Sequence, residues 1–419
     1  MARWPRRSTP APLTVAAADA AGKLVEDTAF TDYLRVEQVG GTVLLGAAVL
    51  AVLVANSPLH SAYEALRELT FGPASLGARL DVEHWAADGL LAIFFFVAGL
   101  EVKRELVVGE LADRRAAALP ALAALGGMVV PALLYLAVAG GDPATARGWA
   151  VPMATDIAFA LGVLAVVGSH APIGLRVFLL SLAVVDDLGA IAVIAVLFTS
   201  ELALLPLAGA AVLLAVYWIA QRRRVTTPWL YVPLSLAVWL CLHASGIHAT
   251  VAGVALGLLT RVRADEGEEH APADRLEHRL QPWSAGVVVP IFAFTAAGVA
   301  IDGGVLSEAV GDRAAIGVVV GLVVGKTIGI LGAALLAVRL RLAVLPAGLG
   351  WSDVAGVALL AGTGFTVSLL IAVLAFADDP ARADRVTLAV LVASVVASVL
   401  GAVAVRLRRS AHVGQEPAC

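Results

Sequence analysis

The sequence predicts an all-α polytopic membrane protein, and three observations support this fold class. Of the 419 residues, 60% are apolar and only 15% are charged, whereas soluble domains carry roughly 25% charged residues. The mean hydropathy is +0.90. Uncharged apolar runs recur that are long enough to cross a hydrocarbon core of about 30 Å as helices. The two cysteines, Cys241 and Cys419, offer no disulfide framework.

Hydrophobic windows predict about twelve crossings. In chain order they are 38–57, 87–107, 116–139, 148–168, 175–199, 202–220, 228–244, 246–261, 283–301, 314–337, 354–376 and 386–407. The crossing near 246–261 is short, and almost no loop separates it from its predecessor. The membrane domain is therefore expected over 37–408, between an N-terminal tail, 1–36, and a C-terminal tail, 409–419.

The basic residues predict the orientation of these crossings. With the N-terminus inside, most of the 29 lysine and arginine residues fall in the two tails and the cytoplasmic loops. Such a bias predicts that both termini are cytoplasmic and that the number of crossings is even. The longest outer loop, 58–86, has apolar stretches around Gly72-Pro73 and Gly77, which are consistent with either a β-hairpin or an irregular loop.

Two adjacent acids, Asp186 and Asp187, lie inside an otherwise uncharged apolar run, 177–200. An ionised carboxylate at that depth costs several kcal/mol unless it is paired or solvated. We interpret the two acids as part of an ion or proton pathway, and the competing interpretation is a buried structural ion pair. Because successive helical residues point about 100° apart, one acid can face a partner helix while the other faces a cavity.

Two crossings contain expected breaks. Pro152 removes a backbone donor in one of them, and Thr155-Asp156 places polar groups at membrane depth. In the other, Gly362-Thr363-Gly364 weakens the helix near its midpoint. Interrupted helices in the two halves of a chain point to a transporter site between inverted repeats. Sequence similarity between the two segments is faint, so the repeat is a hypothesis.

The charges predicted to lie deepest in the membrane are Asp156, Asp186, Asp187 and Lys326. A carboxylate in such a site can hold either a proton or a small hard cation, and this competition is the basis of proton/cation exchange. Oxygen ligands from Asp187, Asp156 and Thr155 suit an alkali cation such as Na⁺. The sequence has no cluster of His and Cys residues that would indicate a transition-metal site. Lys326 can neutralise an acid while no cation is bound.

Five segments resemble the NhaA-type bacterial Na⁺/H⁺ antiporters: DGLLAIFFFVAGLEVKREL, PMATDIAFALGVL, SLAVVDDLGAIAVIAVLFT, SGIHATVAGV and GLVVGKTIGI. That family is a known example of the inverted-repeat transporters, so the repeat hypothesis is not independent of the resemblance. The resemblance implies twelve helices, with broken helices four and eleven crossing at the midplane, in the bacterial cytoplasmic membrane. It also implies electrogenic, pH-regulated export of Na⁺ or Li⁺ by a homodimer that needs no cofactor and binds no nucleic acid.

The resemblance also implies roles for individual residues. Asp187 matches the main cation- and proton-binding carboxylate, with Asp186 as its neighbour, paired with Lys326, and with Thr155 and Asp156 at the broken-helix crossing. Asp88 matches an acid near the outer side. The remaining matches are pH-sensing candidates: Glu101, Arg104, Glu105, His248, Glu277 and His278. The competing interpretation of the cytoplasmic members of this group is a solvated helix end with ordinary ion pairs.

The chain departs from the family pattern at Asp274, Gln281, Ala296 and Thr327. Asp274 and Gln281 stand where basic residues or histidine are usual, which predicts a different pH set-point.

The sequence disfavours an intramembrane aspartyl protease. Such an enzyme would need one acid on each of two facing helices, and the GTGF segment lacks the acid of the expected motif. Two broken helices favour alternating access over a channel. A Na⁺-coupled solute symporter is the main alternative function.

Overall fold

The computed structural model describes residues 39–413 apart from 168–172, 200–201, 266, 302 and 347. The predicted N-terminal tail, 1–36, and the last six residues of the predicted C-terminal tail lie outside this part. The last helix runs on to Val413, five residues beyond the expected end of the membrane domain at 408.

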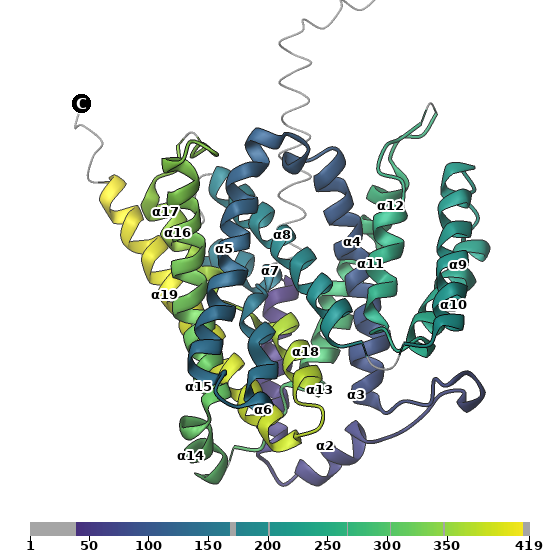
Figure 1. Ribbon diagram of the computed structural model, residues 1–419, viewed down its shortest axis with the longest axis horizontal. Helices are drawn as coiled ribbons and strands as arrows, with labels where there is room; N and C mark the ends of the chain where they lie inside the picture. Colours follow the sequence, from purple (N-terminus) through teal and green to yellow (C-terminus); the bar gives the residue numbers. More distant parts are fainter. Residues whose placement is uncertain are drawn as a thin grey trace, which may run out of the picture.

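The described chain is almost entirely helical (Figure 1). Its helices are, in order, Val39–Ala55, α2 (His60–Arg67), α3 (Val82–His84), α4 (Leu91–Val107), α5 (Arg114–Ala139), α6 (Pro143–Ala146), α7 (Ile157–Val167), α8 (Ile173–Leu197), α9 (Leu204–Arg222), α10 (Pro228–Ala244), α11 (Thr250–Leu259), α12 (Pro272–Trp283), α13 (Val289–Ala296), α14 (Gly303–Gly311), α15 (Arg313–Val319), α16 (Lys326–Arg339), α17 (Trp351–Leu360), α18 (Phe365–Ala375) and α19 (Pro380–Val413). Short 3₁₀ helices are η1 (Ala74–Leu76), η3 (Glu110–Ala112) and η4 (Arg147–Met153).

The helices confirm a polytopic membrane protein. Within the described residues, six continuous helical segments are long and apolar enough to span a membrane, and three bent helix pairs raise the number to nine if each pair is one span. The helices α10 and α11 are apolar but shorter. Each of the twelve predicted crossings overlaps a helix, although not all reach spanning length, so the number twelve stays a prediction.

The structure has breaks at both predicted positions. Helix η4 ends at Met153 and α7 begins at Ile157, with a bend of 48°, and α17 ends at Leu360 and α18 begins at Phe365, with a bend of 46°. The two breaks contact each other, because the backbone N–H of Asp156 donates to the carbonyl of Thr363 at 2.5 Å. A backbone donor at the first break is therefore satisfied by a carbonyl at the second, and polar backbone at membrane depth needs such partners.

In the part of the chain that the structure describes, three π-helical turns were not predicted. They are η2 (Trp85–Leu90), η5 (Ser284–Val288) and η6 (Val320–Gly325), and η6 leads directly into Lys326. Within η6, a Cβ on Gly321 would lie 2.6 Å from Pro152, and one on Gly325 would lie 2.8 Å from Pro131. The glycines thus allow this turn to approach α5 and η4 closely. Such turns are frequent at functional sites.

Loop 58–86 is not a β-hairpin. It contains α2, η1 and α3, and its only described β-type pairing is a single antiparallel bridge between Phe71 and Leu80. Gly72 and Gly77 have φ angles of +116° and +68°, which only glycine adopts at low cost. The irregular alternative is therefore correct, with a short helix added.

Two groups of closely packed helices enclose the broken pair (Figure 1). On one side, α5 packs on α16 so tightly that a Cβ on Gly126 would clash with the carbonyl oxygen of Gly329. On the other, α4 packs on α11, where a Cβ on Gly253 would clash with the carbonyl oxygen of Ala92. Small residues allow such close approach of helices in membranes. These contacts place Lys326 of α16 and Glu101 of α4 on opposite sides of the central helices α7, α8 and α18.

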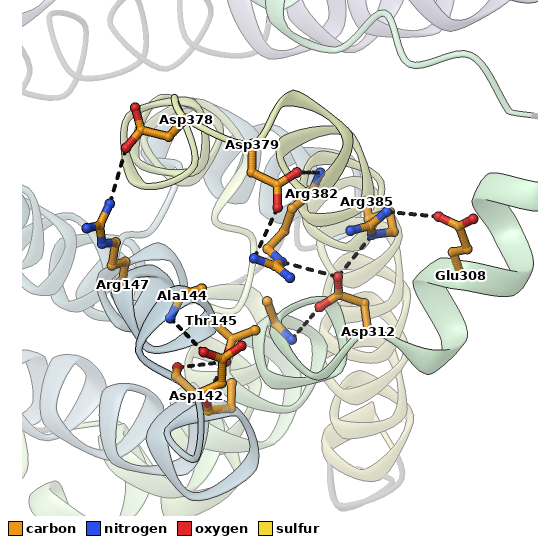
Figure 2. Close-up of polar contacts among 12 residues, drawn as sticks. Asp142, Ala144, Thr145, Arg147, Glu308, Asp312, Asp378, Asp379, Arg382 and Arg385 are labelled. Atoms are coloured by element: carbon orange, nitrogen blue, oxygen red, sulfur yellow. Dashed lines mark hydrogen bonds and ion pairs between the residues drawn. The ribbon is translucent and has the colours of Figure 1, made fainter.

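An ion-pair network holds the ends of several helices near the turn that follows α18 (Figure 2). Asp312, before α15, accepts bonds from Ala314 N at 2.8 Å and from Arg385 Nε at 2.9 Å. Arg382 bridges Asp312 and Asp379, at 3.5 and 3.1 Å. Arg147, at the start of η4, pairs with Asp378 at 3.3 Å. The network therefore connects η4, the end of α18 and the starts of α15 and α19. Sequence reasoning did not find it.

Candidate functional site

Lys326 and Asp186 form a fully buried ion pair. Both side chains have no exposed surface, and Nζ of Lys326 donates to Oδ2 of Asp186. Thr155 joins them: its hydroxyl accepts a bond from Nζ at 2.9 Å and donates to Oδ2 of Asp186 at 2.7 Å. The same hydroxyl lies 2.9 Å from the carbonyl oxygen of Ala361. The three side chains thus connect α16, α8 and both helix breaks.

Asp156 lies where the two broken helices meet. Its Oδ1 accepts a bond from the backbone N–H of Phe159 at 2.9 Å, and its Oδ2 accepts one from Thr366 N at 3.1 Å. One carboxylate therefore caps the start of α7 and the start of α18 together, where the positive ends of the helix dipoles favour a negative charge. The structure therefore gives this residue a positioning role at the broken helices, besides its place in the wall of the cavity described next.

Asp187, unlike Asp186 and Lys326, lines a small cavity of about 50 Å³. The side chain is 5% exposed, and its Oδ1 has no hydrogen-bond partner among the described residues. Four other polar residues line the same cavity: Thr155, Asp156, Glu101 and Gln281. A cavity of this size has room for a few water molecules or a small hydrated cation. Asp186 and Asp187 therefore face different surroundings, as their angular separation on α8 predicts.

The cavity also has lining residues that the sequence did not single out. Ser284, from the π-helical turn η5, and Thr366, from the start of α18, both line it. Neither stands out in the sequence, because a serine or threonine in an apolar run is common. Only the cavity that they share in the folded structure shows that they lie near Asp187.

A second acidic cluster lies at the end of α4, next to α12. Arg104 Nη1 binds Oε1 of Glu277 at 2.8 Å, and Glu277, Glu101 and Glu105 are all buried. Burial raises the pKa of Glu277 from its ordinary 4.5 to about 7; Arg104 lowers it in part, and Glu101 and Asp274 raise it further. His278, by contrast, is exposed on α12. Glu101 belongs to both groups, because it also lines the cavity with Asp187.

Replacing Glu277 with glutamine is expected to remove a pH dependence of the free energy of unfolding. Since the folded pKa is raised, this group contributes stability that is full below about pH 4.5 and is lost as the pH rises through about 7. Thermal melts of detergent-solubilised protein between about pH 4.5 and 8 measure the slope.

The matched control for this prediction is Glu269→Gln, which changes an exposed glutamate in the loop before α12. This control should keep the wild-type slope. An unchanged slope in Glu277→Gln would contradict the assignment of the titration to that carboxyl.

Asp88 and His248 contact each other away from the central cavity. Oδ1 of Asp88, in the π-helical turn η2, lies 3.1 Å from Nε2 of His248, and Nδ1 of His248 is hydrogen-bonded to Thr250 at 2.7 Å. His243 was not predicted; its Nδ1 lies 3.8 Å from Oδ2 of Asp88, and its ring stacks on Trp239. The sequence offered no signal for His243 beyond a histidine in an apolar helix.

Comparisons with known proteins identify the family. The family model described as Na⁺/H⁺ antiporter 1 matches residues 31–405. The chain is 62% identical over 384 residues to Na(+)/H(+) antiporter NhaA 1 of Saccharopolyspora erythraea, covering 92% of each chain. It is 56% identical over 386 residues to Na(+)/H(+) antiporter NhaA 2 of Rhodococcus jostii, covering 92% of this chain and 94% of that one.

A third relative, Na(+)/H(+) antiporter NhaA 3 of Streptomyces coelicolor, is 54% identical over 392 residues, which cover 93% of this chain and 83% of that one. With its apolar spanning helices, the protein is a multi-pass bacterial membrane protein. A match over most of the chain, at this identity, shows that the chain belongs to the Na⁺/H⁺ antiporter 1 family and is of the NhaA type.

Proposed function

We propose that this protein is an electrogenic Na⁺/H⁺ antiporter that exports Na⁺, and also Li⁺, in exchange for protons by alternating access. The observation that carries the proposal is the position of Asp187, whose Oδ1 lacks a hydrogen-bond partner among the described residues and which lines a cavity beside a neutralised Asp186–Lys326 pair. A carboxylate with an unused oxygen lone pair in such a cavity can bind Na⁺ or H⁺, and each displaces the other.

The surroundings of Asp187 support a Na⁺ site. Hard alkali cations prefer oxygen ligands, and Asp156 and Thr155 bring further carboxylate and hydroxyl oxygens to the same cavity. Lys326 keeps Asp186 neutralised, so that Asp187 carries the exchangeable charge. Exchange is electrogenic when the number of protons differs from the number of Na⁺ ions, and Asp156 is a second carboxylate in the same cavity that can take up a proton.

Alternating access is proposed to act on the two helix breaks. They hold each other through Asp156 and Thr363, and Thr155 connects them to the Asp186–Lys326 pair. A cation that draws Asp156 or Thr155 toward Asp187 changes these contacts, which couples binding to a rearrangement. The same proposal includes twelve crossings from 37 to 408 built as inverted repeats, broken helices four and eleven crossing at the midplane, and cytoplasmic termini at both ends.

Regulation by pH is proposed to act through Glu277 and its neighbours. Arg104 and Glu277 join α4 to α12, and both helices contribute to the cavity wall through Glu101 and Gln281. Because the pKa of Glu277 is about 7, its ionisation changes within the physiological range. The proposal also includes His248, whose contact with Asp88 joins the turn before α4 to the start of α11.

Proteoliposomes test the exchange directly. With an imposed pH gradient reported by a fluorescent amine, addition of Na⁺ or Li⁺ should collapse the gradient with no organic solute present. Exchange should be slower when charge cannot be compensated and faster when a K⁺ ionophore dissipates the membrane potential. Proton movement that requires an organic solute would contradict the proposal and favour a Na⁺-coupled symporter.

The homodimer is proposed to form through the outer loop 58–86. Residues Leu69, Phe71 and Leu76 of this loop are exposed apolar side chains, at 57%, 51% and 55%. Deleting Gly72–Asp81 is expected to give monomers that still exchange Na⁺ for H⁺, because the deletion leaves the cavity and both helix breaks intact. Size-exclusion chromatography with light scattering in detergent measures the mass, and wild-type protein at equal concentration is the control. A deletion variant that stays dimeric would contradict the contact.

A further inference from the structure

Ser284 carries a buried hydroxyl that the proposed exchange does not use. The residue is 2% exposed and lines the same cavity as Asp187. Among the residues that the structure describes, its hydroxyl makes no hydrogen bond. By contrast, the buried hydroxyls of Ser368 and Ser398 donate to backbone carbonyls, each at 2.7 Å. Since a buried polar group is seldom left without a partner, the hydroxyl of Ser284 is available to a ligand in the cavity.

The packing of η5 holds Ser284 at the cavity. Ser284 follows Glu277 by seven residues and Gln281 by three, a spacing that places the three on one face of a helix. Glu277 contacts α4, and Gln281 and Ser284 line the cavity. The next residue, Ala285, lies against the first helix, where a Cβ on Gly40 would be 2.7 Å from the Cβ of Ala285. This close contact fixes the rotation of the turn.

Ser284 reaches the cavity from a different wall than the carboxylates. Its turn η5 packs on α4 and α13, whereas Asp187 belongs to α8 and Asp156 to the break before α7. Two other polar side chains near this wall, Glu101 and Gln281, each have an interaction partner of their own. A cation held by the two carboxylates would therefore find a neutral, unused oxygen on a second side.

The hydroxyl of Thr155, on the wall of the carboxylates, is less available. It accepts a bond from Lys326 at 2.9 Å, donates to Asp186 at 2.7 Å and lies 2.9 Å from the carbonyl oxygen of Ala361. A cation must therefore compete with the ammonium group of Lys326 for the oxygen of Thr155. At Ser284 a cation meets no such competitor within the described part of the chain.

From these observations we infer that Ser284 is a further ligand of the transported cation and that it favours Na⁺ over Li⁺. The inference rests on the proposed Na⁺/H⁺ exchange. Hydroxyl oxygens suit hard cations, and selectivity between cations of different size depends on cavity size and ligand number. Li⁺ is the smaller ion and is satisfied by fewer oxygens, such as those of Asp187 and Asp156. Na⁺ takes more ligands, so it gains more from the oxygen of Ser284.

Ser284→Ala tests the inference in proteoliposomes that exchange either cation for protons. The apparent KM for Na⁺ should rise roughly tenfold, the order expected for one hydrogen-bonding group against a charged partner. The KM for Li⁺ should rise by a smaller factor, and the maximal rate should stay, because Asp187 is unchanged. The matched control is Ser398→Ala, the same change at a buried serine of α19 that does not line the cavity. This control should keep both KM values.

Thermal melts of detergent-solubilised protein give a second measure, independent of transport. A cation that binds only the folded protein raises the melting temperature in proportion to its affinity and concentration. Without alkali cations, Ser284→Ala should melt as the wild type does, because no hydrogen bond is lost. It should need about tenfold more Na⁺ than the wild type for the same rise in melting temperature. The rise caused by Li⁺ should be largely retained, with choline chloride keeping the ionic strength constant.

Three results would overturn the inference. They are an unchanged KM and melting shift for Na⁺ in Ser284→Ala, equal changes for Na⁺ and Li⁺, and a melting temperature that is already lowered without any alkali cation, which would indicate a structural role. Each of these is read beside wild-type protein that exchanges Na⁺ for H⁺. Wild-type protein that exchanges no Na⁺ would instead refute the proposed function.

Discussion

Replacing Asp187 with asparagine is expected to abolish Na⁺/H⁺ exchange while the protein stays folded. The substitution keeps the shape of the side chain and removes the charge for which Na⁺ and H⁺ compete. Because no hydrogen bond to Oδ1 is lost and a buried charge is removed, the variant should melt no lower than the wild type. Proteoliposome exchange assays and thermal melts of the same preparation measure the two quantities.

The control for this prediction is Asp378→Asn, the same change at a carboxylate that is 92% exposed in the turn after α18, and it should transport normally. Asp156→Ala should have an intermediate effect, with a raised apparent KM and a lower melting temperature. Its carboxylate caps two helices, and the loss of a helix cap costs about 1 kcal/mol. A folded Asp187→Asn protein that still exchanges Na⁺ for H⁺ would refute the assignment of Asp187 as the shared site.

Replacing Lys326 with alanine should produce the largest loss of stability, on the order of 3–5 kcal/mol, because it leaves Asp186 buried without its cation. Thr155 loses a hydrogen-bond donor in the same change. The loss is smaller if Asp186 then takes up a proton, and in that case the proton stoichiometry of exchange changes. Lys326→Arg should be partly active, since the positive charge is retained.

A double-mutant cycle separates this pair from its surroundings. Thermal melts of Lys326→Ala, Asp186→Asn and the double variant should show that the double variant is less destabilised than the sum of the two single variants. The interaction between residues in direct contact is expected to amount to about 0.5–3 kcal/mol. Strictly additive losses would show that the ion pair makes no net contribution, and the role assigned to Lys326 would then have to be abandoned.

Much of the fold could be predicted from local sequence. Hydrophobic runs had to become helices, because a backbone in lipid must satisfy its own hydrogen bonds. Pro152 and Gly362–Gly364 marked the two breaks correctly, since proline removes a donor and glycine weakens a helix. The hairpin alternative for loop 58–86 was wrong. Short helices occupy most of the loop, and its β-type pairing among the described residues is the single bridge between Phe71 and Leu80.

The π-helical turns could not be predicted, since they depend on packing between distant helices. The turn before Lys326 is possible because Gly321 and Gly325 press against Pro152 and Pro131. The burial of Glu277 and the exposure of His278 likewise depend on how α12 meets α4. The two residues are adjacent in the chain, and the rotation of α12 against α4 buries one side chain and exposes the other.

The sequence by itself determined that this protein spans a membrane, that Asp156, Asp186, Asp187 and Lys326 are the charges deepest in its apolar segments, and that two crossings are interrupted. These properties follow from the free-energy cost of placing charges and unpaired backbone groups in hydrocarbon. This cost applies to each segment separately, so it can be judged from local sequence. Only the tertiary structure decided which acid meets Lys326, since Asp186 contacts a residue 140 positions away while Asp187 faces the cavity. That choice depends on the rotation of α8 between α5 and the broken helices, which local sequence does not specify.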